Sequence, residues 1–320
     1  MVLTVTLNPL LERRVHKRKQ KSEKVNPAET LFAGGKGINV SRQLNHLGIK
    51  NHALTFMGGK NGKLLRKTLA DENIEFSFIS TQSDTRAADI LIDENRLEYK
   101  TEFEPNPIIT KSEAEQFLGK FEKMVRNSSI VVFSGSSPSQ EADMIFSAGI
   151  EIANELDKIC VLDTYGSHLE NAISKGPLVL HNNKDEIESS LGIRLNDEND
   201  YLNLLIYLNK NNIKLAFVTD GSNNFYASKF GFNYRVSPPK VDAINSTGSG
   251  DAFTAGIIYG LEKSMIFDDF IKTAAALGSA NAERWDACNL KKEDFEKYIE
   301  KVKIEAIGKK VKLIDDSPNY

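Results

Sequence analysis

Short apolar runs alternate with helical patterns along most of the chain, and this alternation restricts the fold more than any other feature. The apolar runs of strand length are Val2–Leu7, Ser129–Phe133, Ile159–Asp163, Leu178–Leu180 and Leu215–Val218. Helical patterns separate them, such as residues 36–47 and the long patterns from Gly250 onward. Apolar strands that alternate with helices predict a parallel sheet with helices on both faces. The predicted class is therefore α/β, with a parallel sheet between two layers of helices.

Two segments break this alternation, at about residues 10–32 and 86–104. In the second, Ala88–Ile92 and Leu97–Phe103 resemble the two strands of a hairpin. Strand-rich pieces inserted into an α/β chain predict a small sheet apart from the main one, which can act as a lid. We expect one domain over residues 1–320 that includes this lid.

Composition excludes several classes of protein. The 320 residues are 40% hydrophobic and carry a formal net charge of −3, so the chain can bury a core and exerts no overall attraction on nucleic acid or membranes. No apolar stretch approaches the ~18 residues of a membrane helix. Two cysteines, Cys160 and Cys288, exclude a disulfide scaffold and a Cys-based zinc site, and they indicate a reducing cytoplasm. The basic run Arg13–Lys24 lacks interleaved aromatic residues, so a solvated lid face is favoured over a nucleic-acid patch.

The most specific local motif is a Gly-x-Gly-Asp turn within residues 245–253 that opens a long helix. Glycines let the backbone approach a ligand, and a helix N-terminus offers unpaired N–H groups with a partial positive charge. Asp251 falls in the first helical turn, beside whatever those N–H groups hold. A base next to an N–H cradle suits phosphoryl transfer to a hydroxyl. The alternative is a Gly-rich turn in which Asp251 only stabilises the helix dipole.

A second Gly-rich segment, residues 33–39, places three glycines around Lys36 at the start of another helix. Lys36 could pair with a phosphate there, or it could be a solvated lysine at a loop-to-helix joint. Competing phosphate motifs fail. Residues 57–64 resemble a P-loop, but Met57 and Leu64 stand where glycine and Ser or Thr are required. No Gly-x-Gly-x-x-Gly follows the first strand, which argues against a nicotinamide dehydrogenase.

Asn183 and Glu186 follow the predicted strand that ends at Leu180. Oxygen-bearing side chains at this end of a strand can order the waters of a Mg²⁺ ion beside a phosphate. The same residue types also form a helix N-cap with an acid in the first turn. Taken alone, the cap is the favoured interpretation.

Taken together and in order, these motifs resemble the ribokinase-like carbohydrate kinases of the PfkB family over nearly the whole chain. Within that family the chain is most similar to 1-phosphofructokinases and tagatose-6-phosphate kinases. The residues that carry the resemblance are Thr4–Pro9, Gly34–Val40, Thr85–Arg86, Ser134–Pro138 and Asn245–Asp251. The resemblance implies a ribokinase-like doubly wound sheet with a small β lid. It also implies an ATP- and Mg²⁺-dependent kinase that phosphorylates a sugar phosphate.

The resemblance further implies roles for individual residues. Asp251 would be the catalytic base, and the N–H groups of Gly248, Ser249 and Gly250 would form the anion hole. The residues implied for the phosphosugar are Glu12, Gly35, Lys36, Asn39 and Arg86. Those implied for the nucleotide are Asn183, Thr219, Gly221, Thr247, Gly248 and Gly250, and Glu186 would organise the metal. Fructose 1-phosphate is the first expected substrate and tagatose 6-phosphate the second. Neither nucleic acid nor membrane is expected as a partner, and a homodimer stays open because lids pair in this family.

The chain departs from the family pattern at several positions. Glu12 stands where the family has Asp, and His181 stands where it has Lys. His181 either faces the nucleotide phosphates or packs under the strand end. The nucleotide loop, residues 219–224, and the sugar loop of the lid, residues 102–107, are also altered. These changes keep a second function open, a sugar-phosphate or nucleotide-binding protein with weak or lost kinase activity, whereas the intact Asp251 and its glycines favour the kinase.

Overall fold

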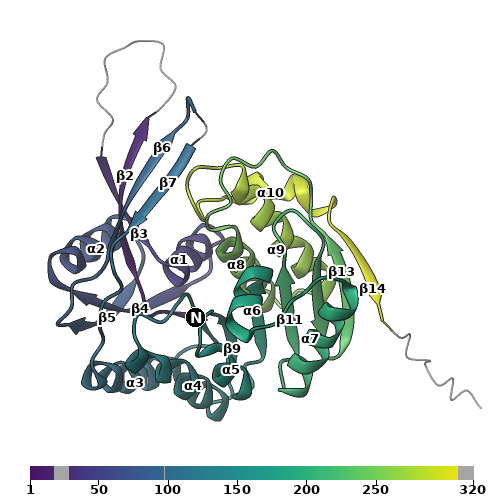
Figure 1. The fold of residues 1–320 in the computed structure, drawn as a ribbon, viewed down its shortest axis with the longest axis horizontal. Helices are drawn as coiled ribbons and strands as arrows, with labels where there is room; N and C mark the ends of the chain where they lie inside the picture. The colour runs from purple at the N-terminus through teal and green to yellow at the C-terminus, as the bar shows by residue number, and fades with distance from the viewer. Residues whose placement is uncertain (18–28, 97, 309–320) are drawn as a thin grey trace, which may run out of the picture.

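The computed structural model describes residues 1–17, 29–96 and 98–308, and a ten-stranded sheet runs through the middle of it (Figure 1). Its strands, in order across the sheet, are β14 (Lys303–Ile307), β13 (Phe232–Ser237), β12 (Phe225–Lys229), β11 (Leu215–Thr219), β10 (Val179–Asn183), β9 (Ile159–Asp163), β8 (Ile130–Ser134), β1 (Val2–Thr6), β4 (Asn51–Gly58) and β5 (Phe76–Thr81). The strands from β11 to β5 pair in parallel, whereas β12, β13 and β14 continue the sheet antiparallel.

Helices cover both faces of this sheet. The helices of one face are α3 (Lys111–Val125), α4 (Gln140–Glu155), α5 (Leu169–Ser174), α6 (Lys184–Leu191) and α7 (Glu198–Lys210). Those of the other face are α1 (Lys36–His46), α2 (Gly59–Asp71), α8 (Ser249–Glu262) and α9 (Phe267–Ala282), with α10 (Lys292–Ile299) packed on α9. The predicted three-layer, doubly wound α/β sheet is confirmed.

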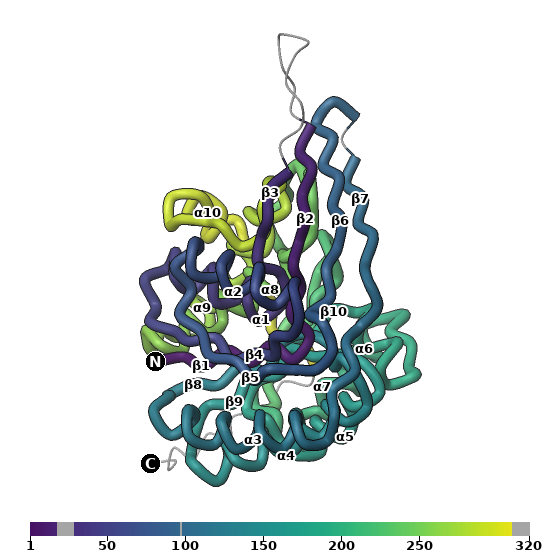
Figure 2. Tube along the Cα trace, turned by 90° about the vertical axis from the view of Figure 1, so that its left-hand side faces the viewer, coloured from purple at the N-terminus to yellow at the C-terminus, as the bar shows by residue number. Residues whose placement is uncertain are grey.

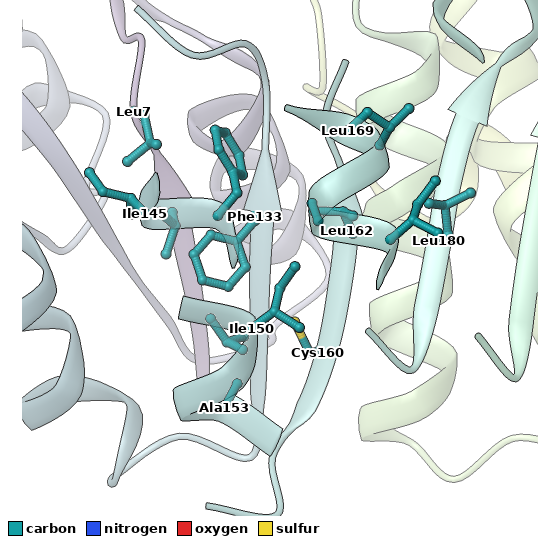
Figure 3. Close-up of a cluster of buried hydrophobic side chains, with 14 of the residues drawn as sticks. Leu7, Phe133, Ile145, Ile150, Ala153, Cys160, Leu162, Leu169 and Leu180 are labelled. Carbon is teal, nitrogen blue, oxygen red and sulfur yellow. The ribbon is translucent and has the colours of Figure 1, made fainter. Parts of the chain in front are cut away.

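Two-sided burial explains why the strands read as continuous apolar runs. Figure 3 shows the core of one face, where Phe133 of β8 lies against Ile145 and Ile150 of α4, and Leu162 of β9 lies nearby. Complete burial of each such side chain contributes about 1.5–3 kcal/mol to the stability of the fold. Alternate residues of the same strands, such as Val132, belong to the core of the opposite face.

A separate four-stranded sheet stands apart from the main one and projects beyond it in Figures 1 and 2. Its strands, in order, are β3 (Glu29–Gly34), β2 (Leu10–Lys17), β6 (Ala87–Asp93) and β7 (Glu98–Phe103). They come from the two segments that interrupt the alternation in the sequence. Leu97 of the predicted hairpin, and residues 18–24 of the basic run, lie outside the described residues.

The sequence prediction named the parallel strands β1, β8, β9, β10 and β11, but it missed the parallel strands β4 and β5 and the antiparallel part of the main sheet. β9 has the predicted bounds, and α1 ends one residue before the predicted Leu47. β12 and β13 went unnamed because their residues mix polar and apolar side chains, as at Asn233 and Arg235. In the ranges given above, no helix is long and apolar enough to cross a membrane. Cys160 and Cys288 are both free and buried.

Candidate active site

Several predicted site residues, together with Asp163, lie at the edge of the main sheet where the parallel strands end. Asp163, Asn183 and Thr219 are the last residues of the neighbouring strands β9, β10 and β11. Lys36 opens α1, and Asp251 lies in the first turn of α8. Ligands of open α/β sheets bind at this edge, beyond the carboxyl ends of the strands.

Asp251 is 4% exposed, and one of its two carboxylate oxygens is held by a neighbour. The Asn39 Nδ2 group donates a hydrogen bond of 2.8 Å to Asp251 Oδ2. Oδ1 receives no hydrogen bond from the described residues. Burial raises the pKa of Asp251 to about 7, with the nearby Asp163 charge acting in the same direction and Lys36 opposing it. A carboxylate with such a pKa is suited to accept a proton near neutral pH.

The turn before Asp251 needs glycine at position 248. Gly248 has φ +79°, and a Cβ there would lie 2.6 Å from the Cβ of Ala287. Gly248 is the N-cap of α8, and no side chain caps this helix. The Ser249 N–H donates to the Ser246 carbonyl at 3.1 Å, and the Thr247 N–H donates to Asn245 Oδ1 at 3.1 Å. Of the three predicted anion-hole amides, those of Gly248 and Gly250 donate no hydrogen bond within the described part of the chain.

Lys36 lies between two carboxylates rather than in solvent. Its Nζ is 2.9 Å from Asp163 Oδ1 and 2.7 Å from Glu186 Oε1. Burial opposes the charge of Lys36, but Asp163, Glu186 and Asp251 outweigh it and raise the pKa of the ammonium group. Lys36 is therefore a permanent cation that joins the ends of α1, β9 and α6.

Asp163 is completely buried and is the main site residue that sequence reasoning missed. Its Oδ2 accepts hydrogen bonds from Ser134 Oγ at 3.2 Å and Thr254 Oγ1 at 3.0 Å. Burial acts against its ionisation, but Lys36 and His181 more than offset this, so the pKa of Asp163 is low, about 2. An acidic residue at the end of a predicted strand was the available signal.

Glu186 and Asn183 form the helix cap that the sequence favoured. The Asn183 N–H donates to Glu186 Oε2 at 3.1 Å, and the Glu186 N–H donates to Asn183 Oδ1 at 2.8 Å. Glu186 Oε1 is at the same time paired with Lys36. No group of three or more His, Cys, Asp or Glu side chains in the described part of the chain is arranged to hold a metal ion. The cap leaves Glu186 Oε1 with one described contact, that to Lys36, so the two interpretations of Glu186 are compatible.

A cavity of about 480 Å³ opens beside the turn before α8. Four of the residues predicted for the nucleotide, Asn183, Thr219, Gly221 and Gly250, line it. Its apolar side chains include Phe225, Phe253, Pro238, Val241 and Ala275. Thr247 and Gly248 are not among its lining residues, although they build the adjoining turn. A second cavity, of about 540 Å³ between the small sheet and α10, is lined by none of the predicted site residues.

His181 packs inside the protein, as the second of its two interpretations supposes. It is 1% exposed and its ring stacks on Phe253. Its Nδ1 is 2.9 Å from Thr254 Oγ1 and its Nε2 is 3.2 Å from Thr219 Oγ1. Because Thr254 donates its one hydroxyl proton to Asp163, the Nδ1 of His181 carries a proton and donates to Thr254. His181 thus supports Asp163 and is not among the residues that line the cavity of about 480 Å³.

Glu12, predicted to contact sugar hydroxyls, is paired within the small sheet. Its Oε2 lies 2.6 Å from Arg14 Nη2, and a Cβ on Gly34 would lie 2.4 Å from its Oε1. Arg14 Nη1 also pairs with Asp286 Oδ1 at 2.8 Å, which connects β2 to the residues that follow α9. Gly35 has φ +114°, and a Cβ there would lie 3.0 Å from Thr6 Cγ2. Neither Glu12 nor Gly35 hydrogen-bonds to the charges around Lys36.

Arg86 precedes β6 and keeps part of its hydrogen-bonding capacity unused. It donates to Asn106 Oδ1 at 3.1 Å and to the Asn8 carbonyl at 3.4 Å. Its Nε and the Oδ1 of Asn8 are buried without a hydrogen-bond partner in the described residues. Tyr165, which sequence reasoning also missed, has its ring centre 5.3 Å from Lys36 Nζ.

These residues form two ends of one candidate site. We call Lys36, Asp163, Glu186 and Asp251, with the turn 247–250, the reaction end. We call Glu12, Gly35 and Arg86, with Asn8 and Asn106, the sugar end. Lys36 and Asn39, which the sequence prediction assigned to the phosphosugar, contact the acidic residues of the reaction end: Lys36 pairs with Asp163 and Glu186, and Asn39 donates to Asp251.

Comparison with known proteins identifies the family of this chain. The model of the family described as pfkB family carbohydrate kinase matches residues 8–294. A 1-phosphofructokinase of Borreliella burgdorferi is 29% identical over 315 residues, which are 96% of this chain and 99% of the relative.

Solved structures share the fold. A structure from Thermotoga maritima, described as a possible 1-phosphofructokinase, matches with a TM-score of 0.85 and 25% identity, covering 96% of this chain and 99% of the other. The ribokinase of Arabidopsis thaliana, solved with ribose and ATP, matches with a TM-score of 0.70 and 18% identity over 93% and 98% of the two chains. The fold is ribokinase-like.

Proposed function

The chain belongs to the pfkB family of carbohydrate kinases, and on this premise we propose that it transfers the γ-phosphoryl group of ATP to a hydroxyl of a ketohexose monophosphate. Fructose 1-phosphate is the first proposed substrate, supported by the relative named 1-phosphofructokinase. Tagatose 6-phosphate is the second. The observation that carries the proposal is Asp251, buried at the uncapped N-terminus of α8 beside a cavity of about 480 Å³.

In the proposed reaction, the substrate hydroxyl oxygen attacks the γ-phosphorus of ATP. A new oxygen–phosphorus bond forms, the bond from the γ-phosphorus to its bridging oxygen breaks, and ADP leaves. The hydroxyl proton passes to Asp251 Oδ1, the carboxylate oxygen that Asn39 does not hold. Positioning and charge stabilisation dominate phosphoryl transfer, because there is little covalent chemistry for a protein to supply. The amides of Gly248 and Gly250 are proposed to stabilise the negative charge on the transferred group.

The residues around the cavity fit ATP. A cavity of about 480 Å³ lies within the usual size of small-molecule sites, roughly 300–1,000 Å³. Its apolar side chains suit a nucleobase. Thr219 and Asn183 at the strand ends, and the free amides of the α8 turn, suit phosphates.

The residues also fit Mg²⁺, provided that phosphate and water oxygens supply most of the ligands of the ion. Mg²⁺ commonly binds through one or two carboxylates plus substrate phosphates and keeps several waters. Glu186 supplies a carboxylate, and the Oδ1 of Asn182 is a buried oxygen without a hydrogen-bond partner among the described residues. We propose that these two oxygens hold waters of the ion. When bound, Mg²⁺ would neutralise phosphate charge as the transferred group departs.

The sugar end is proposed to hold the phosphate and hydroxyl groups of the substrate. Arg86 has an unpaired buried Nε–H, and charge-assisted contacts from arginine to phosphate are among the stronger hydrogen bonds. Glu12 would accept from a sugar hydroxyl through Oε1, since Arg14 occupies Oε2. The small sheet that carries Glu12 is proposed to act as the lid of this single kinase domain. We also propose that the protein forms a homodimer. The two free cysteines support a location in a reducing cytoplasm.

A coupled assay of ADP release tests the function. We would compare fructose 1-phosphate, tagatose 6-phosphate, fructose 6-phosphate and free fructose at equal concentrations with ATP and Mg²⁺. We expect rapid ADP release with a ketohexose phosphate and little with free fructose. Equal turnover of fructose and its phosphates would contradict a phosphosugar substrate.

A second function is a binding protein of the same fold with weak or lost kinase activity. The pairing of Glu12 with Arg14 favours it, because it engages a group that the sugar would otherwise use. Calorimetric titration with ATP and with fructose 1-phosphate separates the two. Binding of both ligands without ADP release would support the binding protein and exclude the kinase.

A further inference from the structure

Arg42 lies on α1, one helical turn after Asn39, and its guanidinium is held on three sides. Its Nε donates to Glu72 Oε2 at 2.7 Å, and Nη1 donates to Asn39 Oδ1 at 2.6 Å. Nη2 donates to the carbonyl of Ala33. Only 11% of the Arg42 side chain is exposed. Glu72, at the end of α2, is fixed in turn because its Oε1 accepts the Ala33 N–H at 3.0 Å.

This arrangement decides which way the amide of Asn39 points. A guanidinium group can only donate hydrogen bonds, so the amide atom that faces Arg42 must be the oxygen. The NH₂ group of Asn39 is then directed to Asp251 Oδ2, at 2.8 Å. Without Arg42 the amide could rotate and present its oxygen to the carboxylate, which would be repulsive.

The direction of the amide matters for Asp251 in two ways. The hydrogen bond from Asn39 engages Oδ2 and leaves Oδ1 as the oxygen without a described partner. The same bond stabilises the ionised form and so lowers the pKa of Asp251, which burial raises. The other charged or titratable groups around Asp251 are Lys36 on α1, Asp163 on β9, Glu186 on α6 and Cys288 after α9.

We infer that Arg42, anchored by Glu72, is a positioning residue that acts through Asn39 to orient the Asp251 carboxylate for proton transfer. The inference deepens the proposed function and rests on it where it assigns the base. The competing explanation is that Arg42 only joins α1 to α2 and β3. The two explanations differ in one respect: only the first requires the effect of Arg42 to pass through the Asn39 side chain.

A double-mutant cycle tests this requirement. The four proteins are wild type, Arg42→Met, Asn39→Ala and the double variant. Outer partners that orient an active-site group typically contribute about 10- to 100-fold to activity, so we expect Arg42→Met to lower kcat by about that factor. In the Asn39→Ala background the same change should cost less than about threefold, because residues that act through one contact are not additive. Equal losses in the two backgrounds would overturn the inference.

The pH profile supplies a readout that a purely structural role would not move. In Arg42→Met, the acid limb of kcat/KM should shift to higher pH, because the Asn39 amide no longer has to stabilise the carboxylate. Arg235→Met is the control, because Arg235 is also an ion-paired arginine, with Glu198 and Glu305 as its partners, but lies on β13. Its pH profile should match wild type.

Carboxyl-carbon NMR keeps the test independent of turnover. The Asp251 resonance, assigned by its loss in Asp251→Asn, should titrate at higher pH in Arg42→Met than in wild type. An unchanged titration would contradict the inference even if no kinase activity were found. Suppose that wild type is active, Asp251→Asn is inactive and the losses in the cycle are additive. This inference would then be wrong, while the proposed function would stand. If Arg42→Met fails to fold, Glu72→Gln replaces it in the same cycle, with a smaller shift in the same direction.

Discussion

The two ends of the candidate site differ in how their charged groups are satisfied. At the reaction end, Lys36 and Asp163 take partners from several elements, and Asp163 is completely buried among them. At the sugar end, Glu12 pairs with Arg14 two residues along the same strand, and Arg86 keeps a buried N–H without a described partner. The reaction end is thus organised before any ligand arrives, which is how electrostatic stabilisation is most effective. At the sugar end, we propose that the substrate completes the hydrogen bonding of Arg86.

Removal of Lys36 should cause the largest loss of stability, because its ammonium group pairs with two carboxylates of the reaction end. Lys36→Met leaves Asp163 and Glu186 facing each other without their cation. Loss of one partner of a buried ion pair costs about 3–5 kcal/mol, so we expect a loss of that size in the free energy of unfolding at pH 7. Denaturant unfolding measures it.

Two further variants sharpen this prediction. Lys36→Met combined with Asp163→Asn should recover part of the loss, because it removes one of the uncompensated charges. Lys175→Met breaks a surface pair with Glu151 and should cost at most about 1 kcal/mol. If Lys36→Met costs no more than Lys175→Met, the reaction end does not depend on its cation.

Removal of Arg86 should affect substrate binding but not the reaction end. Hydrogen bonds from charged groups contribute about 1.5–3 kcal/mol, so Arg86→Ala should raise KM for the phosphosugar roughly 10- to 100-fold. KM for ATP should change little. Steady-state kinetics with each substrate varied in turn measures both, with Arg126→Ala, whose side chain pairs with Glu122 on the surface of α3, as control. A parallel rise in KM for ATP would place Arg86 outside the sugar end.

Asp251 predicts a pH dependence of both activity and stability. The base must be ionised, so kcat/KM should rise with pH through about 7, where burial sets the pKa of Asp251. The folded pKa lies above the unfolded value of roughly 3.9. The stability linked to Asp251 is therefore complete below pH 4 and is lost as pH rises through about 7.

A stability comparison checks the second half of this prediction. Asp251→Asn removes the ionisation, so it should unfold at higher denaturant concentration than wild type at pH 8, with the difference shrinking toward pH 4. Asp268→Asn, which changes an exposed acid in the first turn of α9, should show no such trend. A difference independent of pH would mean that Asp251 is ionised without penalty in the folded protein.

Replacement of His181 should have the smallest effect on ligand binding. Its ring is packed on Phe253 and hydrogen-bonded to two threonines, so it gives the nucleotide no charge. Calorimetric titration of ATP at pH 6 and pH 8 should give the same pH dependence for wild type and His181→Gln. If ATP bound more tightly at pH 6 than at pH 8 in wild type but not in His181→Gln, His181 would contact the nucleotide phosphates after all.

The sequence predicted the fold and the importance of Lys36 and Asp251, but it did not predict which residues contact them. Continuous apolar strands and Gly-rich helix starts are local patterns, so the sheet, the start of α1 and the turn before Asp251 followed from the sequence. The Lys36–Asp163 contact joins residues 127 positions apart, and no local pattern encodes it. The Glu12–Arg14 pair is different, because residues two apart lie on the same face of a strand, and this spacing could have predicted it.

Helical spacing gave a further signal that was not used. Asn39 and Arg42 are three residues apart on α1, so their side chains are neighbours on one face. The direction of the Asn39 amide could not be predicted, because it depends on Glu72 from α2 and Asp251 from α8. Thr219 and Gly221 of the altered loop, residues 219–224, still line the cavity of about 480 Å³.

The kcat of Asp251→Asn tests the central claim most directly, namely that the buried carboxylate of α8 takes the proton from the substrate hydroxyl. The substitution keeps the shape of the side chain but removes its ability to accept that proton. General base catalysis contributes about 10²–10⁴-fold, so kcat with fructose 1-phosphate should fall by that factor while the dissociation constant for ATP stays within about twofold. A variant that keeps more than about a tenth of the wild-type kcat would show that the base lies elsewhere.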